Sequence, residues 1–426
     1  MIYLYRVFTF VIYPFQFLIF PFSRKAREFL KKRKIDKDRI LQICEDFTSK
    51  RVIWLHASSV GELDQCKALI SVIRKNEPNT VVIQSVFSES IKEENLRNLD
   101  VYFYFRLPLD FYFSYNFIFE KFKPEILILM AWDTWPNLIY AAKKYHSKVF
   151  LFCASINKTS GRNSFFLEKL TQSIFQKIDI ISASSEFFLP EIFRLVKDKE
   201  RVFALGDTRV DSVVGKIRTK KKIDPLKKLL PIKNQTIIFA STYPVCEEIL
   251  VPMISDLLKS GKNVWIFPHH IEKKRIQEIV RLLDINSIPY SLFSEITNKY
   301  KKVILFDKLG ILAYAYQYAE LSYVGGAIHN RVHNVLEPAY FGLPIVTGSR
   351  IFHSPEAVSL KNLGGLFSLE KKEDIPEIIL KLLKDPKIRS RIKSMNKKFV
   401  LSGEGASKRL YGQFIRDIPE NKICKI

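Results

Sequence analysis

The sequence predicts a two-domain α/β protein in which two doubly wound parallel sheets face each other across a cleft, with a membrane anchor at the N-terminus. Three observations predict this architecture. Short apolar runs alternate with longer segments in both halves, a polar lysine-rich stretch separates the halves, and an uncharged apolar segment opens the chain. We therefore expect a membrane anchor at 1–22, a first α/β domain at 23–217, a linker at 218–235, a second α/β domain at 236–405 and a C-terminal segment at 406–426.

The anchor is predicted from Val7–Phe22, which carries no charge and consists mostly of Phe, Ile, Val and Leu. This run is shorter than the ~20 residues that span a bilayer comfortably, and Pro14 and Pro21 would kink a helix within it. Directly after it, Ser23–Arg39 has nine Lys or Arg against three acids. Basic residues that follow an apolar segment stay on the cytoplasmic side and bind anionic headgroups. We expect an anchor that either spans the membrane or lies in its interface.

The composition limits the partners. The chain has 68 Lys and Arg against 44 Asp and Glu, a net charge of +24, which implies an anionic partner: nucleic acid, a membrane surface or a phosphorylated substrate. No aromatic and basic motif of a nucleic-acid-binding module is present, so we expect no nucleic acid. The five cysteines show neither redox nor metal-ligand spacing, which predicts free thiols: Cys44, Cys66, Cys153, Cys246 and Cys424.

The strands are predicted from short apolar runs, each separated from the next by enough residues for a helical crossover. In the first half these runs are Val52–Leu55, Val81–Ile83, Ile126–Met130, Val149–Phe152 and Ile178–Ser182. In the second half they are Ile237–Ala240, Val264–Phe267, Val303–Phe306, Leu321–Val324 and Ile345–Val346. Helical periodicity follows at 62–74 and 272–283. Because ligands bind at the carboxyl ends of such strands, residues just after a strand are the best functional candidates.

The first candidate is Glu62, in the segment His-Ala-Ser-Ser-Val-Gly-Glu that follows the first strand. Small residues and a glycine allow a tight turn into a helix, with Glu62 near its N-terminus. A carboxylate there could accept a proton from a substrate hydroxyl. It could equally be a helix-capping acid.

The second candidate is Asp133, in the segment Met-Ala-Trp-Asp-Thr-Trp-Pro-Asn after another apolar strand. Its carboxylate could take part in chemistry. Alternatively, Asp133 or Thr134 caps a helix that has Pro136 in its first turn.

The third group lies in the second half. Pro268, His269 and His270 follow one strand, and Gly325 and Gly326 follow another, where they permit close backbone approach. Asn334 and Glu337 have a spacing that would place both on one helical face, suited to gripping ribose hydroxyls. The histidines His269, His270, His329, His333 and His353 lack metal-ligand spacing, so we expect no metal site.

Several segments, in order, resemble the motifs of bacterial 3-deoxy-D-manno-octulosonic acid (Kdo) transferases. His56–Glu62 looks like their H-A-x-S-V-G-E, and Trp135-Pro136-Asn137 resembles the end of E-T-E-L-W-P-N. The other matching segments are Gly206–Asp211 with G-N-x-K-F-D, Ser241–Glu248 with S-T-H-P-G-E-E, Pro268–Glu272 with P-R-H-P-E-R, and Val324-Gly325-Gly326 followed by His333–Ala339.

The resemblance implies a GT-B fold with two Rossmann-like domains, the first binding the acceptor and the second the donor. It also implies an inverting, metal-independent and cofactor-free transfer of Kdo from CMP-Kdo to a lipid A precursor, in lipopolysaccharide core synthesis at the cytoplasmic face of the inner membrane. By resemblance Glu62 is the general base, and Asp133 and Arg209 stabilise charge in the transition state. The CMP-contacting positions that it implies are Pro268, His269, Leu309, Gly310, Ile311, Asn334, Val335, Leu336 and Glu337.

The chain departs from the family pattern at several positions. Ala131 and Asp133 replace the two glutamates of E-T-E, and Leu309-Gly310-Ile311 replaces M-G-E. His269 stands for the arginine of P-R-H, and Arg331-Val332 for the G-G before H-N. Two alternatives follow: a GT-B transferase that uses a uridine or guanosine sugar, or a degenerate, non-catalytic membrane-associated relative. Retention of Glu62 argues against the second.

Overall fold

The structure is a computed structural model that describes residues 2–14, 23–156, 165–220, 226, 229, 235–297 and 299–416. It contains two compact units. In the described part of the chain the first unit ends at Ser212 and resumes at Gly405, and the second runs from Val213 to Glu404. Most of the predicted linker, together with residues 15–22 of the predicted anchor and 417–426 of the C-terminal segment, lies outside the described residues.

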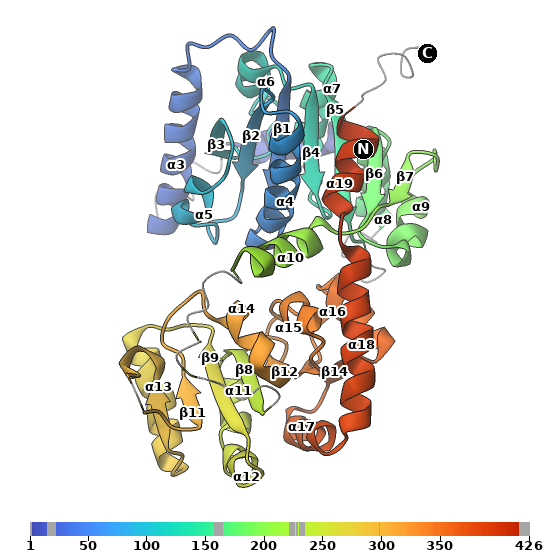
Figure 1. The fold of residues 1–426 in the computed structure, drawn as a ribbon. Coiled ribbons are helices and arrows are strands. Elements are labelled where there is room, and N and C mark those ends of the chain that lie inside the picture. Colours follow the sequence, from blue (N-terminus) through green and yellow to red (C-terminus); the bar gives the residue numbers. More distant parts are fainter. Residues whose placement is uncertain are drawn as a thin grey trace. The chain divides into compact units, whose positions relative to one another are not determined.

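The first unit is built on a parallel sheet of seven strands in the order β3-β2-β1-β4-β5-β6-β7 (Figure 1). Its strands are β1 Val52–Ala57, β2 Val81–Val86, β3 Phe103–Arg106, β4 Ile126–Met130, β5 Lys148–Ala154, β6 Ile180–Ala183 and β7 Val202–Ala204. Its helices are α1 Ile2–Ile12, α3 Arg24–Leu41, α4 Val60–Asn76, α5 Glu93–Arg97, α6 Asn116–Phe122, α7 Pro136–Lys144, α8 Phe165–Phe175, α9 Leu189–Leu195 and α19 Ala406–Leu410.

Helices cover both faces of this sheet, which separates its core into two layers. Trp54, Leu127 and Leu151 point into one layer, with α6 and α7, because side chains alternate along each strand. Ile53, Ile128 and Phe152 point into the other, with α4. The returning C-terminal segment fills the second layer, where Phe414 contacts the rings of Phe150, Phe152 and Phe203.

The second unit repeats the plan with a parallel sheet in the order β10-β11-β9-β8-β12-β13-β14. Its strands are β8 Thr236–Thr242, β9 Asn263–Pro268, β10 Tyr290–Leu292, β11 Val303–Leu305, β12 Ala319–Val324, β13 Ile345–Gly348 and β14 Leu366–Leu369. Its helices are α11 Pro244–Leu250, α12 Ile254–Lys259, α13 Lys273–Ile285, α14 Leu312–Ala315, α15 Leu336–Phe341, α16 Pro355–Leu363, α17 Ile375–Lys384 and α18 Pro386–Gly403. The helix α10 Thr208–Lys220 carries the chain out of the first unit.

All ten predicted strands are present, and the prediction of two doubly wound parallel sheets is confirmed. The four strands that the sequence did not predict are β3, β7, β10 and β14, which are the two edges of each sheet. Their side chains are mostly half-buried, whereas every residue of β1, β2, β4 and β12 is buried.

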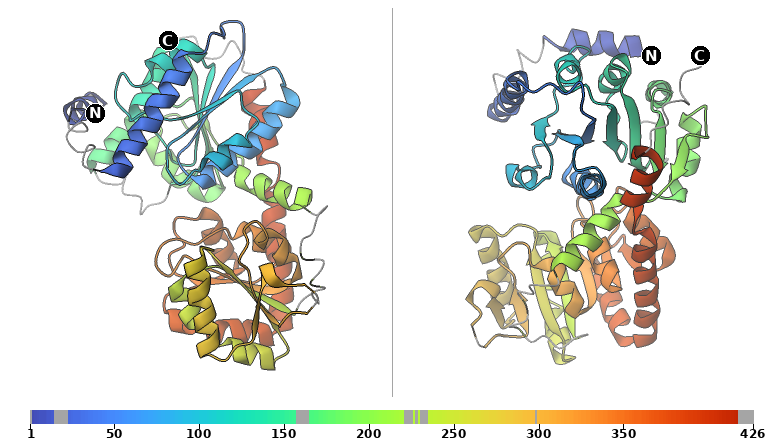
Figure 2. Two further views of the ribbon diagram at one scale, coloured as in Figure 1. Left: turned by 90° about the vertical axis from the view of Figure 1, so that its left-hand side faces the viewer. Right: turned by 45° about the horizontal axis from the view of Figure 1, so that its top comes forward.

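The first helix has one side against the first unit and one side exposed. Tyr5 Oη donates to Asp110 Oδ2 at 2.8 Å, and the Arg6 guanidinium lies over the Tyr112 ring, 4.4 Å from its centroid. In Figure 2 this helix, in the darkest blue, lies along the outside of the first unit. Among the described residues, no helix has both the length and the apolar character needed to cross a membrane.

Candidate active site

Glu62 lies where the first strand of the first unit turns into α4. Ser59 caps the helix and accepts from the Glu62 backbone N–H, while Glu62 Oε2 accepts from the backbone N–H groups of Ser58 and Ser59 at 2.6 and 2.9 Å. This is a capping box, so the capping interpretation is correct. Both bonds end on Oε2, and no described hydrogen bond ends on Oε1. Capping therefore leaves one carboxylate oxygen for another partner.

The Glu62 side chain has an unusual proton affinity. Burial and, after it, the negative charge of Asp133 raise its pKa to about 7, against the lowering effect of the two backbone N–H groups and of Arg209. A carboxyl group that titrates near neutrality can both accept and release a proton. Such a shift is typical of functional carboxylates.

Asp133 reaches the same edge of the sheet from the turn after β4. The turn starts at Ala131, whose φ of 58° is in the left-handed region. Ser58 Oγ donates to Asp133 Oδ2, and His56 Nε2 lies 2.9 Å from the same oxygen. Burial alone would raise the pKa of Asp133, but His56, Ser58 and Trp135 together hold it below its ordinary value. Asp133 is thus an anion beside the protonatable Glu62.

Arg209, in the first turn of α10, supplies the positive charge of this group. A side chain at Gly61 would place its Cβ 3.2 Å from Arg209 Nη2, so the guanidinium lies directly over the turn that holds Glu62. Asp207 fixes the approach, since its Oδ1 accepts from the Arg209 backbone N–H and from Gln65 Nε2, both at 2.8 Å. The structure therefore brings Glu62, Asp133 and Arg209 together at one edge of the first sheet.

The predicted cap of α7 is wrong. Pro136 is in the first turn as expected, but the N-cap residue is Trp135, which makes no capping bond through its side chain. Asp110, from a loop far away in sequence, accepts instead from the backbone N–H groups of Asn137 and Leu138 at 3.1 and 3.2 Å. Because Asp110 caps α7, the Asp133 side chain is not needed as a cap and lies against Ser58 and His56 instead.

In the second unit, five rings gather after β8, β9 and β12. Tyr243 stacks on His269 with centroids 4.9 Å apart, His269 stacks on His333 at 4.3 Å, and His329 meets Tyr243 edge-on at 4.4 Å. Tyr243 Oη lies 3.0 Å from His333 Nε2. Burial and the neighbouring imidazoles lower the pKa of His333 to about 4, so this ring is neutral at pH 7. His270 is the fifth member.

Gly325 and Gly326 do permit a close approach, but to protein backbone. A Cβ at Gly325 would lie 2.1 Å from the Ser241 carbonyl oxygen, and one at Gly326 would lie 2.2 Å from that of Arg331. The two glycines therefore hold the ring-bearing loops against each other.

The expectation that Asn334 and Glu337 share a helical face is wrong. The helix α15 begins at Leu336, so Asn334 precedes it, and its Oδ1 accepts from the Leu336 backbone N–H at 2.9 Å. Asn334 itself is exposed. Glu337 lies close to Tyr316, where its charge adds to the effect of burial and raises the pKa of the Tyr316 hydroxyl. The side chains of Val335 and Leu336 are buried in the core, which leaves only their backbone for a ligand.

The remaining predicted donor positions lie on loops at the same edge of the second sheet. Pro268 ends β9 and is buried, whereas His269 is exposed. Leu309 is 72% exposed, Gly310 has a φ of 81°, and Ile311 is buried ahead of α14. In the part of the chain that the structure describes, no three His, Cys, Asp or Glu side chains are grouped so that they could hold a metal ion.

Sequence reasoning missed several residues of these two sites as site residues. His56 and Ser58 belong to the motif that pointed to Glu62, so their position after β1 was an available signal. Tyr243 lies in the segment 241–248 that resembles S-T-H-P-G-E-E, which was also an available signal. Ser85, near the end of β2, gave no signal of its own, because its role depends on which strands become neighbours.

Solved structures with the same fold are two-domain sugar-nucleotide enzymes. A UDP-GlcNAc 2-epimerase from Neisseria meningitidis has a TM-score of 0.63 at 15% identity, covering 86% of this chain and all of that chain. A glycosyltransferase from Rickettsia africae has a TM-score of 0.57 at 11% identity, covering 88% of this chain and all of that one. The fold class is thus a GT-B-like pair of parallel α/β sheets.

Sequence comparison is more specific. Residues 29–212 match the family model of 3-deoxy-D-manno-octulosonic-acid transferase, the kdotransferases. The 3-deoxy-D-manno-octulosonic acid transferase of Chlamydophila psittaci is 26% identical over 96% of each chain, and that of Haemophilus influenzae is 26% identical over 84% of this chain and 85% of its own. A bifunctional glycosyltransferase/methyltransferase of Fusobacterium nucleatum is 28% identical over 77% of this chain, which spans about half (51%) of its length. The first unit thus matches the Kdo transferase family model, and the chain is similar to Kdo transferases over most of its length.

Proposed function

We propose that this protein is an inverting, metal-independent glycosyltransferase that moves Kdo from CMP-Kdo to a lipid A precursor. The observation that carries the proposal is the buried Glu62, with a pKa of about 7 and an Oε1 that accepts no hydrogen bond from the described residues, beside Asp133 and Arg209. The similarity to Kdo transferases supports Kdo as the sugar.

In the proposed reaction Glu62 takes the proton of the acceptor hydroxyl. The hydroxyl oxygen forms a bond to the anomeric carbon of Kdo, and the bond from that carbon to the phosphate oxygen of CMP breaks, with its electron pair leaving on CMP. Attack from the face opposite to the leaving group inverts the configuration, by analogy with inverting glycoside hydrolysis. The guanidinium of Arg209 is placed to stabilise negative charge near the reacting atoms without a metal ion.

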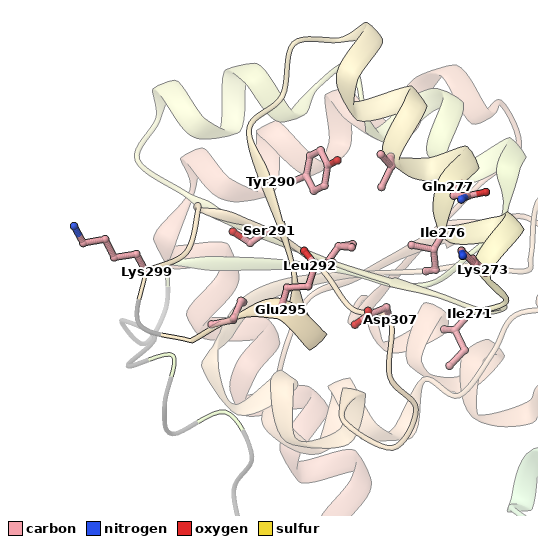
Figure 3. A pocket seen from close by; sticks show the side chains of 12 residues that line it. Ile271, Lys273, Ile276, Gln277, Tyr290, Ser291, Leu292, Glu295, Lys299 and Asp307 are labelled. Carbon is pink, nitrogen blue, oxygen red and sulfur yellow. The ribbon is translucent and has the colours of Figure 1, made fainter.

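The second unit is the proposed donor-binding part. A hollow of about 820 Å³ lies between α13 and the β10 edge (Figure 3). Its lining includes Ile271, two residues after His269, and Asp307, two residues before Leu309. Two of the three predicted CMP-contacting segments, 268–269 and 309–311, are therefore close in sequence to residues that line this space. Its mixed lining, with Ile276, Gln277 and Tyr290, suits the apolar face and polar edge of a nucleoside.

The first unit carries a surface suited to a membrane interface, which supports a lipid acceptor and a location on the inner membrane. Opposite the side that holds Tyr5 and Arg6, α1 exposes large apolar side chains, each at least 54% exposed: Tyr3, Leu4, Val7, Phe8, Phe10 and Val11. The helix α3 follows with the basic residues of the predicted cytoplasmic segment. An apolar helix face with basic residues beside it lies in the headgroup region of anionic membranes.

The membrane proposal is tested with Phe8→Ser/Phe10→Ser, which leaves the contacts of Tyr5 and Arg6 intact. We expect flotation of the wild type with anionic vesicles to persist at high salt, because salt does not screen apolar insertion. Flotation of the double variant should fall more steeply as salt rises, since the loss of both phenylalanines weakens apolar insertion and leaves more of the binding to the basic residues. Ile285→Ser, at an 80% exposed position in the second unit, is the control. Equal salt resistance of all three proteins would show that α1 does not insert.

The reaction itself is tested by incubating the purified protein with pre-formed CMP-Kdo and a lipid A precursor, with and without excess EDTA, and weighing the lipid product. We expect a mass increase of one or more Kdo residues under both conditions. If a uridine or guanosine sugar gives product and CMP-Kdo gives none, the donor is that nucleotide sugar and not CMP-Kdo. Dependence on added divalent metal would contradict the metal-independent mechanism.

A further inference from the structure

Ser58 touches both carboxylates of the first site. Its backbone N–H donates to Glu62 Oε2 at 2.6 Å, and its hydroxyl donates to Asp133 Oδ2. One residue therefore sets the relative position of the two acids, although they come from different strands. A movement of Asp133 would be transmitted to Glu62 through Ser58.

Behind Asp133 lies His56, a fully buried histidine at the end of β1. Its Nε2 is 2.9 Å from Asp133 Oδ2 and its Nδ1 is 2.8 Å from Ser85 Oγ. Ser85 Oγ also accepts from Trp54 Nε1 at 2.8 Å. His56 Nε2 also accepts from Trp135 Nε1 at 3.1 Å and lies 3.2 Å from Ser58 Oγ. This one buried ring therefore contacts Asp133 and both of the side chains, Ser58 and Trp135, that hydrogen-bond to it.

We propose that His56 is a positioning residue for the reaction: supported from behind by Ser85, it keeps the Asp133 carboxylate and its donors Ser58 and Trp135 in place, and through Ser58 it holds Asp133 against Glu62. The proposal rests on the assignment of Glu62 as the base. It gives Asp133, which stands where the family motif has a glutamate, a role towards Glu62 rather than towards the donor.

The surroundings of the pair fit this role. Two carboxylates held together favour a proton on one of them, and the anion of Asp133 is one cause of the raised pKa of Glu62. The other charged or titratable groups that face the pair are Arg209 from α10, Cys66 from α4 and Tyr115 ahead of α6. Of these only Arg209 is positive, and it lies over Gly61 on the Glu62 side. His56, Ser58 and Trp135 therefore support Asp133 together, and His56 contacts both of the others.

The test compares His56→Leu, which removes both polar ring nitrogens, with His56→Gln, whose side-chain amide can reach the position of Nε2. The readout is the titration of the Asp133 side-chain carboxyl carbon by carbon-13 NMR in the full-length protein without substrate, assigned with Asp133→Asn. We expect the pKa of Asp133 to rise by about one unit or more in His56→Leu, and to stay near that of the wild type in His56→Gln. An unchanged titration in folded His56→Leu, or a failure of His56→Gln to restore it, would overturn the proposal.

Ser85→Ala keeps the test decisive if His56→Leu does not fold. It removes only the hydroxyl behind His56, and we expect a smaller rise in the same direction, whereas Ser88→Ala, at a half-buried position after the same strand where the hydroxyl bonds to Ser90, should change nothing. Equal titrations in Ser85→Ala and Ser88→Ala would contradict the proposed support. Because no substrate is present, a wild type that titrates as expected but transfers no Kdo refutes the proposed function and leaves this inference standing.

Discussion

Two buried glutamates occupy matching places in the two units and have opposite partners. Glu62 lies in the first turn of the helix after β1, and Glu247 in the first turn of the helix after β8, each following the first strand of its unit. Burial raises the pKa of both. Glu247 is paired with Arg275 and accepts from Thr242 Oγ1 at 2.7 Å. Among the residues that the structure describes, the partners of the Glu62 carboxylate bond to Oε2 alone, and the side chain faces the anion of Asp133.

This difference separates a structural acid from a reactive one. An ion pair satisfies a buried carboxylate and fixes α11 to α13, where Arg275 lies. A neighbouring anion does the opposite, since it raises the affinity of Glu62 for a proton. The second unit presents tyrosine and histidine rings and backbone at its functional edge, and the first presents two carboxylates and a guanidinium. We infer that the first unit does the proton chemistry and the second the binding.

The largest expected effect is on catalysis by Glu62→Gln. Glutamine can keep the capping box but cannot accept the acceptor proton, so transfer should fall by about 10²–10⁴-fold. Single-turnover transfer with saturating CMP-Kdo measures this. The control is Glu247→Gln, assayed under conditions where it is folded, which should retain transfer within a few-fold. Near-normal transfer by folded Glu62→Gln would remove Glu62 from the mechanism.

The same two variants should change stability in opposite directions. The folded-state pKa of Glu62, about 7, is above its ordinary 4.5, so the native state loses stability as the pH rises through 7, and Glu62→Gln removes this loss. We expect Glu62→Gln to be more stable than the wild type by up to about 3 kcal/mol at pH 8 and equal to it at pH 4. Glu247→Gln should be destabilised by about 3–5 kcal/mol, because it leaves Arg275 without its buried partner.

Urea unfolding at both pH values, followed separately for the two units, measures these differences. A shift of the same sign for both variants at pH 8 would remove the distinction between the two acids.

A smaller effect is expected from Tyr243→Phe. It removes the hydroxyl 3.0 Å from His333 Nε2 and so loosens the ring cluster. The loss of about 0.5–1.5 kcal/mol corresponds to a CMP dissociation constant weakened about 2- to 10-fold. Calorimetry with CMP measures it, with Tyr300→Phe, an exposed tyrosine, as the control. If Tyr243→Phe leaves CMP affinity unchanged, the ring cluster is not part of the donor site.

The sequence was sufficient to predict the central strands of both sheets, but it was insufficient to predict their edge strands. Central strands such as β1 and β4 are buried on both faces and so read as continuous apolar runs. An edge strand has one side open: Tyr290–Leu292 reads Tyr-Ser-Leu, with all three residues half-buried, and Val202–Ala204 has only Val202 buried. Nothing in such a short, mixed run distinguishes it from a loop.

The candidate site was likewise predictable only in part from the sequence. Glu62 was predictable because a local motif places it directly after a strand. The partners that set its chemistry come from other strands: Asp133 follows β4, which pairs with β1, and Ser85 lies on β2, which pairs with β1 on the other side. Asp110 shows the same limit, since a sequence window around α7 cannot reveal a cap that arrives from 26 residues before Pro136.

The most direct test of the division between the units is the pH dependence of kcat/KM for transfer from pre-formed CMP-Kdo. For the wild type we predict a rise through about pH 7, as Glu62 loses its proton. In Asp133→Asn the rise should move to lower pH, because the neighbouring anion is gone, while Tyr243→Phe should leave its midpoint unchanged. A wild-type profile that is flat from pH 5 to 8, or an Asp133→Asn profile with an unchanged midpoint, would contradict the account.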